Sequence, residues 1–398
     1  MPTMRSNDRL DNLIPEITEW RRDIHQHPEL GYDVQRTAGF VADKLREFAI
    51  DEVIEGLGRT GVVGVIKGRS VNSGKVIGLR ADMDALPIVE SSGAPWSSVT
   101  SGSMHACGHD GHTAMLLGAA RALADSRDFD GTVVVIFQPA EEGGGGGLAM
   151  IQDGLMDRFG IQEVFGLHNM PNLPVGEFAI RPGPLMACAD EFDIIVQGRG
   201  GHAAMPHVCV DPVVVSSHIV LALQTIVSRG VKPTDPLVVS VTTMEVTGGA
   251  YNVIPQAVHL RGTLRAFDED VRLASKERVI EIAQQTAGTF GATAMVDYRD
   301  GYPPTVNHEK QTAFAVEVAA QVVGQDRVDP QRPPMMGAED FSYMLNERPG
   351  AFIFLGNGSS ANLHHPQYDF NDEAIRYGCQ YWTTLVSSAM PLSSSPVA

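Results

Sequence analysis

The run Thr132–Phe137, TVVVIF, constrains the fold of this 398-residue chain more than any other segment. A continuous run of apolar and β-branched residues is typical of a strand that is buried on both faces. Strands of this kind belong to parallel sheets that helices cover on both sides. We therefore expect a layered α/β domain that is built around this strand.

Other short apolar runs, bounded by Gly and Ser, predict further strands of the same sheet. Helical spacing of apolar residues predicts helices between and before these strands. Strands that alternate with helices favour an α/β/α arrangement. The expected strands are 61–67, 75–80, 164–167 and 351–355, and the expected helices are about 10–27, 37–48 and 114–124.

The middle of the chain has a different order of elements. Strands are expected at 191–197, 237–246, 257–266 and 293–298, and helices at 212–228 and 268–289, with Asp268 as the N-cap. This βαββαβ order is the ferredoxin-like pattern. We therefore expect a domain over residues 184–295, inserted into a discontinuous domain of residues 1–183 and 296–398.

The formal net charge of -18 excludes nucleic acid as a partner, because phosphate binding needs a surplus of Lys and Arg. The four cysteines form no CxxC pair, which indicates a reducing compartment. No apolar signal segment and no apolar run of about 18 residues is visible. We therefore expect a cytoplasmic protein that does not cross a membrane.

Polar clusters follow several of the predicted strands. In open α/β sheets, ligands bind beyond the carboxyl ends of the strands, so these clusters are expected to converge on one site. The clusters are Arg80–Asp84, Met104–His112, Pro139–Glu142, Gly166–His168 and Leu363–Pro366.

The residue types in these clusters suit a pair of metal ions. Cys107 and His109, separated by a glycine, can reach one metal centre, and thiolate, imidazole and carboxylate ligands suit Zn, Mn, Ni or Co. Adjacent residues of an extended chain point in opposite directions, so one glutamate of Glu141–Glu142 can bind metal while the other faces the reacting water. Taken singly, these residues also fit a buried thiol, structural histidines and an exposed acidic turn. Their distribution over several strand ends favours two ions about 3.5 to 4 Å apart.

Two glycine motifs do not fit nucleotide binding. Gly56–Gly61 matches GxGxxG but precedes a strand where the dinucleotide motif follows one. Gly143–Gly147 lacks the Gly-Lys-Ser/Thr that ends a P-loop.

Taken in order, these segments resemble the M20 metallopeptidase family, and in particular its amidohydrolase branch. That branch includes hippurate hydrolases, N-acyl-L-amino acid amidohydrolases and auxin-conjugate hydrolases. The resemblance covers nearly the whole chain. The matching segments are HQHPELGY, RADMDALPI, MHACGHDGHTAMLLGAA, FQPAEEGGGG, GLHNMP, GRGGHAAMPH, NVIP, YPPTVN, MGAEDFSYM and LHHPQYDFND.

The resemblance implies a role for each matching residue. Glu141 is the implied general base, and Asp84 orients the ligands. Asp82 stands where other branches of the family have a ligand histidine, and His365 beside His364 leaves the last ligand open to a second assignment. The implied metal ligands are Cys107, His109, Glu142, His168 and His364.

The resemblance also implies roles for the inserted domain, as a lid and a dimerisation domain. In it, His202 is implied to stabilise the oxyanion, and Asn252 and Arg265 are implied to contact substrate. The first domain is then the catalytic, metal-binding domain.

The expected reaction is hydrolysis of the amide bond of an N-acyl amino acid, with two divalent metal ions per subunit of a homodimer or higher homo-oligomer. Hippurate, N-acetyl amino acids and auxin conjugates are the candidate substrates. One alternative is a dipeptidase or aminopeptidase of the same fold. A second alternative is a metal-dependent small-molecule binding protein without catalysis, and a third is a thiol-regulated protein that uses Cys107.

Overall fold

The computed structural model describes residues 6–246 and 248–392. The chain forms two compact units. The first runs to Gly183 and includes Val306–Pro333 and the residues from Asp340 onward; the second comprises Pro184–Thr305 and Pro334–Glu339. The predicted boundary at residue 295 differs from this division because strand β13 (Thr293–Tyr302) continues past it without a break.

The first unit contains an eight-stranded sheet in the order β1-β2-β4-β3-β5-β16-β6-β15. Its central strands β4, β3, β5 and β16 are parallel to one another, as the buried run Thr132–Phe137 predicts. Their carboxyl ends therefore lie at one edge of the sheet. The strands are β1 (Glu52–Leu57), β2 (Gly61–Lys67), β3 (Val76–Asp82), β4 (Thr132–Gln138), β5 (Glu163–Pro171), β6 (Phe178–Ala179), β15 (Val328–Asp329) and β16 (Gly350–Gly358).

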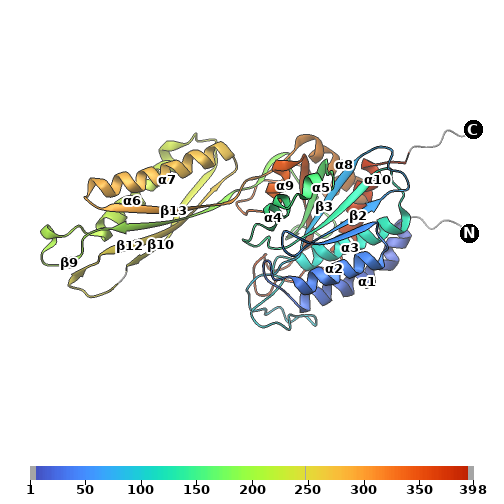
Figure 1. Ribbon diagram of the computed structural model, residues 1–398, viewed down its shortest axis with the longest axis horizontal. Helices are drawn as coiled ribbons and strands as arrows, with labels where there is room; N and C mark the ends of the chain where they lie inside the picture. Colours follow the sequence, from blue (N-terminus) through green and yellow to red (C-terminus); the bar gives the residue numbers. More distant parts are fainter. Residues whose placement is uncertain (1–5, 247, 393–398) are drawn as a thin grey trace, which may run out of the picture. The chain divides into compact units, whose positions relative to one another are not determined.

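Helices cover this sheet because their apolar residues recur on one side. The helices are α1 (Ser6–Gln26), α2 (Gln35–Glu47), α3 (His109–Ser126), α4 (Gly146–Gln152), α5 (Leu155–Arg158), α8 (Glu309–Val323), a 3₁₀ turn η3 (Gln325–Arg327), α9 (Phe341–Glu347) and α10 (Ala374–Ala389). In α1, the side chains of Ile17, Trp20 and Ile24 are buried. Helix α3 packs against α1, α2 and α10, and α1, α2 and α3 lie side by side in Figure 1. Helices α4 and α9 pack on each other and contact β4, β5 and β16.

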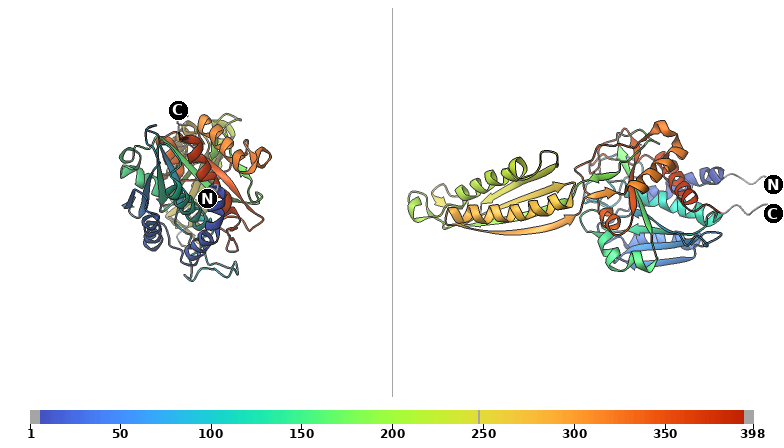
Figure 2. Two further views of the ribbon diagram at one scale, coloured as in Figure 1. Left: turned by 90° about the vertical axis from the view of Figure 1, so that its right-hand side faces the viewer. Right: turned by 90° about the horizontal axis from the view of Figure 1, so that it is seen from above.

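The second unit has the predicted βαββαβ order, and its sheet runs β10-β12-β8-β13 with all neighbours antiparallel. Helices α6 and α7 lie side by side on the sheet (Figures 1 and 2). Asp268 caps α7 as predicted, because its side chain accepts the Val271 N–H. The elements are β8 (Ala189–Gln197), α6 (Pro212–Thr225) with a π-helical turn η2 (Ile226–Gly230), β10 (Leu237–Val246), β12 (Ala257–Ala266), α7 (Glu269–Thr289) and β13.

Short elements complete the chain. They are β7 (Gly183–Met186), β9 (Gly201–His202), the 3₁₀ turn η1 (Pro206–Val208), β11 (Val253–Ile254) and β14 (Thr305–Asn307). Strands β9 and β11 pair with each other at one end of the second unit, where Figure 1 labels β9.

One helical stretch corrects the expectation that no segment is apolar enough to span a membrane. Pro212–Gly230, which is α6 with its π-helical turn, passes that test by length and composition. In the structure, Val215, Ile219 and Leu223 of this stretch are buried in the core of the second unit. Only 28% of the apolar window is buried, so packing in the core accounts for one side of this stretch and apolar residues are exposed on the other.

A buried charge cluster ties α1 to the segments that follow β3 and β16. His25 Nδ1 lies 2.8 Å from Asp110 Oδ2, and His25 Nε2 lies 3.4 Å from Glu90 Oε1. Arg21 Nη1 lies 3.3 Å from the same Asp110 oxygen, and Arg21 Nη2 lies 2.7 Å from Asp372 Oδ1. Burial alone would lower the pKa of His25, but the Asp110 carboxylate raises it to about 9. The cluster therefore holds His25 in its charged form.

This cluster predicts a pH dependence of stability. In the unfolded chain the pKa of His25 returns to about 6.5. The stabilisation that charged His25 gives to the folded state is therefore fully present below about pH 6.5 and is lost as the pH rises through about 9. At 1.36 kcal/mol per pKa unit, this stabilisation amounts to about 3 kcal/mol. We expect the unfolding midpoint of the wild-type chain to approach that of His25→Gln between pH 6.5 and 10. The exposed His207→Gln serves as control, and parallel curves for wild type and His25→Gln would contradict the prediction.

Candidate metal centre

The five candidate ligands lie together at the carboxyl edge of the parallel strands. His168 belongs to β5, and His109 is the first residue of α3, directly after Cys107 and Gly108. Glu142 follows β4, and His364 follows β16. Parallel strands of one sheet end at the same edge, so segments far apart in the sequence meet there.

The candidate donor atoms include two groups that share one sulfur. The donor atoms of Cys107, His109 and His168 lie within 4.8 Å of one another, and those of Cys107, Glu142 and His364 do the same. Cys107 Sγ is 3.4 Å from His168 Nε2, and His364 Nε2 is 3.2 Å from Glu142 Oε1. Two groups with a common thiol fit two neighbouring cations.

Backbone carbonyls orient two of the imidazoles toward this centre. His109 Nδ1 donates to the Asp84 carbonyl at 2.8 Å, and His168 Nδ1 donates to the Asn169 carbonyl at 2.6 Å. Each ring therefore presents the lone pair of Nε2. The buried Nε2 of His109 has no hydrogen-bond partner among the described residues. A second nitrogen held by a carbonyl is the usual support of a metal-binding histidine, so the donor set fits divalent ions.

Electrostatics at the site favour a cation. Burial alone would lower the pKa of His109, but the carboxylates of Asp82 and Asp84 raise it to about 10. Burial, with the neighbouring glutamates, raises the pKa of the Cys107 thiol well above its usual range. Burial lowers the pKa of His168 well below its usual range, and the nearby His112 lowers it further, so the imidazole of His168 is neutral. The field at His109 Nε2 thus stabilises positive charge, whether a proton or a metal ion carries it.

Asp82 is committed to other partners. Its Oδ2 accepts from Arg80 Nη1 at 2.7 Å, and its Oδ1 accepts from His112 Nδ1 at 2.6 Å. The remaining nitrogen of His112 accepts the Asn169 N–H at 2.9 Å. Asp82 therefore acts in this structure as the acceptor between an arginine and a histidine.

Asp84 holds the turn that carries both glutamates. Its two carboxylate oxygens accept the N–H groups of Glu141 and Glu142 at 2.9 and 3.1 Å. Ala140, just before them, has φ of +54°, and residues 141–144 form a turn. The expectation that the two glutamates point in opposite directions along extended chain is therefore wrong. Both carboxylates come within 4.8 Å of the donor nitrogen of His109.

The structure separates the two adjacent histidines after β16. His364 has φ of +63°, its N–H donates to the Ala106 carbonyl at 2.8 Å, and its Nε2 faces Glu142. His365 Nδ1 accepts the Gln367 N–H at 3.1 Å within its own loop. The geometry therefore favours His364 over His365 as the ligand.

The three remaining candidate residues all belong to the second unit. The exposed His202 pairs with Val253 across β9 and β11, and the Ala203 N–H donates to the Asn252 carbonyl at 2.9 Å, so His202 and Asn252 are neighbours. Arg265 donates to Thr263 Oγ1 and to the Leu264 carbonyl near the other end of β12. His202 pairs with Val253, shortly before β12 begins at Ala257. Arg265 lies eight residues further along that strand, or about 26 Å at about 3.3 Å per residue. One subunit therefore does not bring Arg265 to His202.

A buried network behind the site has no counterpart among the predicted roles. Arg80 donates to Gln138 Oε1 and to Asp340 Oδ1, both at 2.9 Å. Asp340 also accepts from Gln138 Nε2 at 2.7 Å and from the Gly147 N–H at 2.8 Å. The signal that could have found it is an arginine at the end of the apolar run that forms β3, because a charged residue in a buried strand requires partners.

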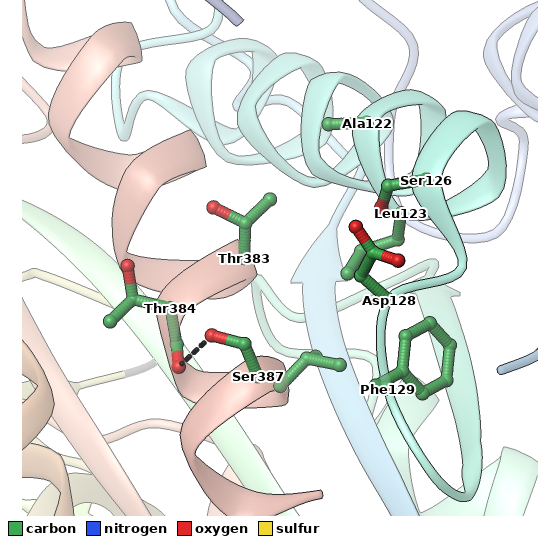
Figure 3. A pocket seen from close by; sticks show the side chains of 9 residues that line it. Ala122, Leu123, Ser126, Asp128, Phe129, Thr383, Thr384 and Ser387 are labelled. Atoms are coloured by element: carbon green, nitrogen blue, oxygen red, sulfur yellow. Dashed lines mark hydrogen bonds between the residues drawn. The ribbon is translucent and has the colours of Figure 1, made fainter. Parts of the chain in front are cut away.

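A separate pocket of the first unit lies between α3 and α10 (Figure 3). Ser387 Oγ donates to the Thr384 carbonyl at 3.1 Å on one wall, and Asp128 is the one ionisable group in its described lining. No candidate ligand lines this pocket, so it does not compete with the site at the strand ends.

Comparisons with known proteins place the chain in a family. The model of the family described as Peptidase family M20/M25/M40 matches residues 78–388, which is more than half of the chain. A hippurate hydrolase of Campylobacter jejuni is 42% identical, over 94% of this chain and 98% of that protein. An N-acetyl-L-cysteine deacetylase of Bacillus subtilis is 41% identical, over 92% and 86%. A thermostable carboxypeptidase of Saccharolobus solfataricus is 42% identical, over 93% and 95%.

Two solved structures are similar over almost their whole length. A putative aminohydrolase from methicillin-resistant Staphylococcus aureus has a TM-score of 0.89 and 33% identity, covering 96% of this chain and 98% of that one. A dinuclear metal-binding peptidase of the M20 family from Bacillus subtilis has a TM-score of 0.82 and 34% identity, covering 96% and 99%.

Proposed function

The chain belongs to peptidase family M20/M25/M40, and from that membership we propose that it hydrolyses the amide bond of N-acyl amino acids with two divalent metal ions. The products are a carboxylic acid and a free amino acid. The observation that carries the proposal is the pair of donor groups that share Cys107, with Glu141 beside them.

Cys107, His109, Glu142, His168 and His364 are the residues that hold the ions in this proposal. The mixed sulfur, nitrogen and oxygen donors suit Zn, Mn, Ni or Co. Divalent ions bound there supply Lewis acidity toward the amide carbonyl and lower the pKa of water.

Glu141 is the general base. Its carboxylate comes close to His109 and Glu142, and Asp84 fixes its position through the backbone of the turn. It takes a proton from the attacking water and passes it to the leaving nitrogen, which departs as a neutral amine. Because Glu141 is largely buried, little bulk water competes for that proton.

His202 stabilises the oxyanion that forms on the acyl carbonyl. Its Nδ1 accepts the Ala204 N–H at 3.1 Å, so its Nε2 carries the proton and is available to donate. Asn252 and Arg265 bind the rest of the substrate, and a guanidinium suits its carboxylate. An N-acyl amino acid is far shorter than the distance along β12, so His202 and Arg265 reach one substrate only from different subunits.

The separation of His202 from Arg265 within one subunit supports a homodimer, as do two surfaces of the second unit. Strand β10 is an edge strand of its sheet. On α6, Val214 and Leu221 are exposed at 49% and 68%. An apolar helix face and a free strand edge are common elements of self-association.

All four cysteines are free thiols, which supports a location in the reducing cytoplasm. Cell fractionation that recovers the protein outside the cytoplasm would contradict this location.

The carboxypeptidase relative favours a second candidate activity, release of the last residue from a blocked peptide. The dipeptidase and aminopeptidase alternative needs a partner for a free α-amino group. Rates on hippurate, N-acetyl amino acids, N-blocked dipeptides and free dipeptides distinguish these activities. We expect the metal-reconstituted enzyme to turn over the N-acyl amino acids fastest, and free dipeptides slowest or not at all. Absence of hydrolysis on every substrate with Zn, Mn, Ni and Co would favour a non-catalytic binding protein.

Glu141→Gln should lose turnover, whereas Cys107→Ala should lose bound metal. We expect Glu141→Gln to keep two metal ions per subunit but to lower kcat by about 10²- to 10⁴-fold, since it removes proton transfer. Cys107→Ala should lose bound metal, because it removes the donor that both groups share. Elemental analysis and kcat are measured on each, with the exposed Glu52→Gln as control. Full activity in Glu141→Gln, or normal metal content in Cys107→Ala, would refute the assigned role.

His202→Ala should lower kcat by about 10²- to 10³-fold without loss of metal, because one donor to the oxyanion is removed. His207→Ala, on a neighbouring turn, serves as control. Mixing His202→Ala with Glu141→Gln subunits should restore part of the activity if His202 acts on the partner subunit. Sedimentation velocity measures the oligomeric state directly. A monomer, or an unchanged kcat in His202→Ala, would overturn this part of the proposal.

A further inference from the structure

Asn169 is fully buried directly after His168, and its carboxamide has partners on all sides. Its Nδ2 donates to the Cys107 carbonyl at 2.6 Å and lies 3.1 Å from His112 Nε2. Its Oδ1 accepts the Tyr368 hydroxyl proton at 2.7 Å. Its backbone carbonyl is the acceptor that orients His168. One residue therefore contacts several of the segments that form the site.

The carboxamide sits against the backbone between two candidate ligands. Gly108 separates Cys107 from His109 and has φ of +86°. A Cβ at position 108 would lie 2.3 Å from Asn169 Nδ2 and 2.5 Å from the Tyr368 hydroxyl oxygen. The chain reaches this close approach only because residue 108 has no side chain. The position of the Cys107–His109 segment is thus set by contact with Asn169 and Tyr368.

Tyr368 extends the connection to the last ligand. It is fully buried, and its N–H donates to the His365 carbonyl at 2.9 Å in the loop that carries His364. Burial raises the pKa of its hydroxyl well above the usual range, so the hydroxyl remains a donor. The Asn169–Tyr368 hydrogen bond therefore links the His364 loop to strand β5.

We propose that Asn169 is a positioning residue of the dinuclear centre, whose carboxamide sets the relative placement of the segments that carry Cys107, His168 and His364. The inference rests on the proposed function, because it takes these three residues as ligands. Asn fits this place because its Nδ2 donates to the Cys107 carbonyl while its Oδ1 accepts from the Tyr368 hydroxyl. Without it, these buried groups lose their partner, and the ligand segments lose a common contact.

Metal affinity tests the inference by a measurement that does not depend on turnover. Cobalt binding is measured by competition with a chelator and by the thiolate-to-cobalt charge-transfer absorption. We expect Asn169→Ala to bind cobalt about 10- to 100-fold more weakly than the wild type, the range found when a residue that supports ligands is removed. Tyr368→Phe keeps the ring and removes one hydrogen bond, so it should weaken the ion held by Cys107, Glu142 and His364 more than the other ion.

Asn307 is the matched control. It is buried like Asn169, and its Nδ2 donates to the Arg181 and Phe352 carbonyls at 3.0 and 2.9 Å. Its Oδ1 accepts the Phe352 N–H at 2.7 Å, and no candidate ligand is among its partners. Asn307→Ala should lower the unfolding midpoint but leave cobalt affinity and absorption unchanged.

The outcomes separate the inference from the proposed function. Wild-type cobalt affinity in both Asn169→Ala and Tyr368→Phe would overturn the positioning role. An equal loss of affinity in Asn307→Ala would overturn it too, because the effect would then follow from lost stability alone. A wild-type protein that binds no pair of ions would overturn the proposed function itself, and the inference with it.

Discussion

Three hydrogen bonds to Asp84 organise the candidate metal centre. The carboxylate accepts the amides of Glu141 and Glu142, and the carbonyl accepts the proton of His109 Nδ1. Together these contacts place both glutamates and turn the His109 lone pair toward them. A residue in the segment that follows β3 thereby determines the geometry of groups that follow β4 and begin α3. Such support from residues around the ligands is what gives a metal site its geometry.

Other buried residues likewise hold the segments around the rest of the centre by hydrogen bonds and ion pairs. Arg80 and His112 hold Asp82, Asn169 contacts the backbone of Cys107, and the charge cluster of α1 contacts Asp110 directly after His109. The first unit thus assembles the candidate ion-binding residues from its own strand ends. The second unit carries His202 and Asn252 at one end and Arg265 near the other. That separation is the physical reason for proposing that two subunits share one substrate.

Strands and helices were largely predictable because burial leaves a clear pattern of apolar residues. The buried strand at Thr132–Phe137 and the βαββαβ order of the second unit follow from that pattern. Two expectations about local structure were wrong. The Glu141–Glu142 turn is folded back by a distant carboxylate, which no local spacing indicates. The stretch Pro212–Gly230 is more apolar than expected: one side packs on the sheet, and apolar residues are also exposed on the other side.

The amino-acid sequence alone determined which donor atoms are available, since a thiol, imidazoles and carboxylates at strand ends follow from residue type and order. It also determined the family, because ordered motifs over nearly the whole chain carry that likeness. The tertiary structure decided which lone pairs face the centre, that Asp82 is hydrogen-bonded to Arg80 and His112, and that His364 rather than His365 approaches Glu142. These outcomes depend on hydrogen bonds between segments far apart in the chain. Their partners are known only when the strands have been placed side by side.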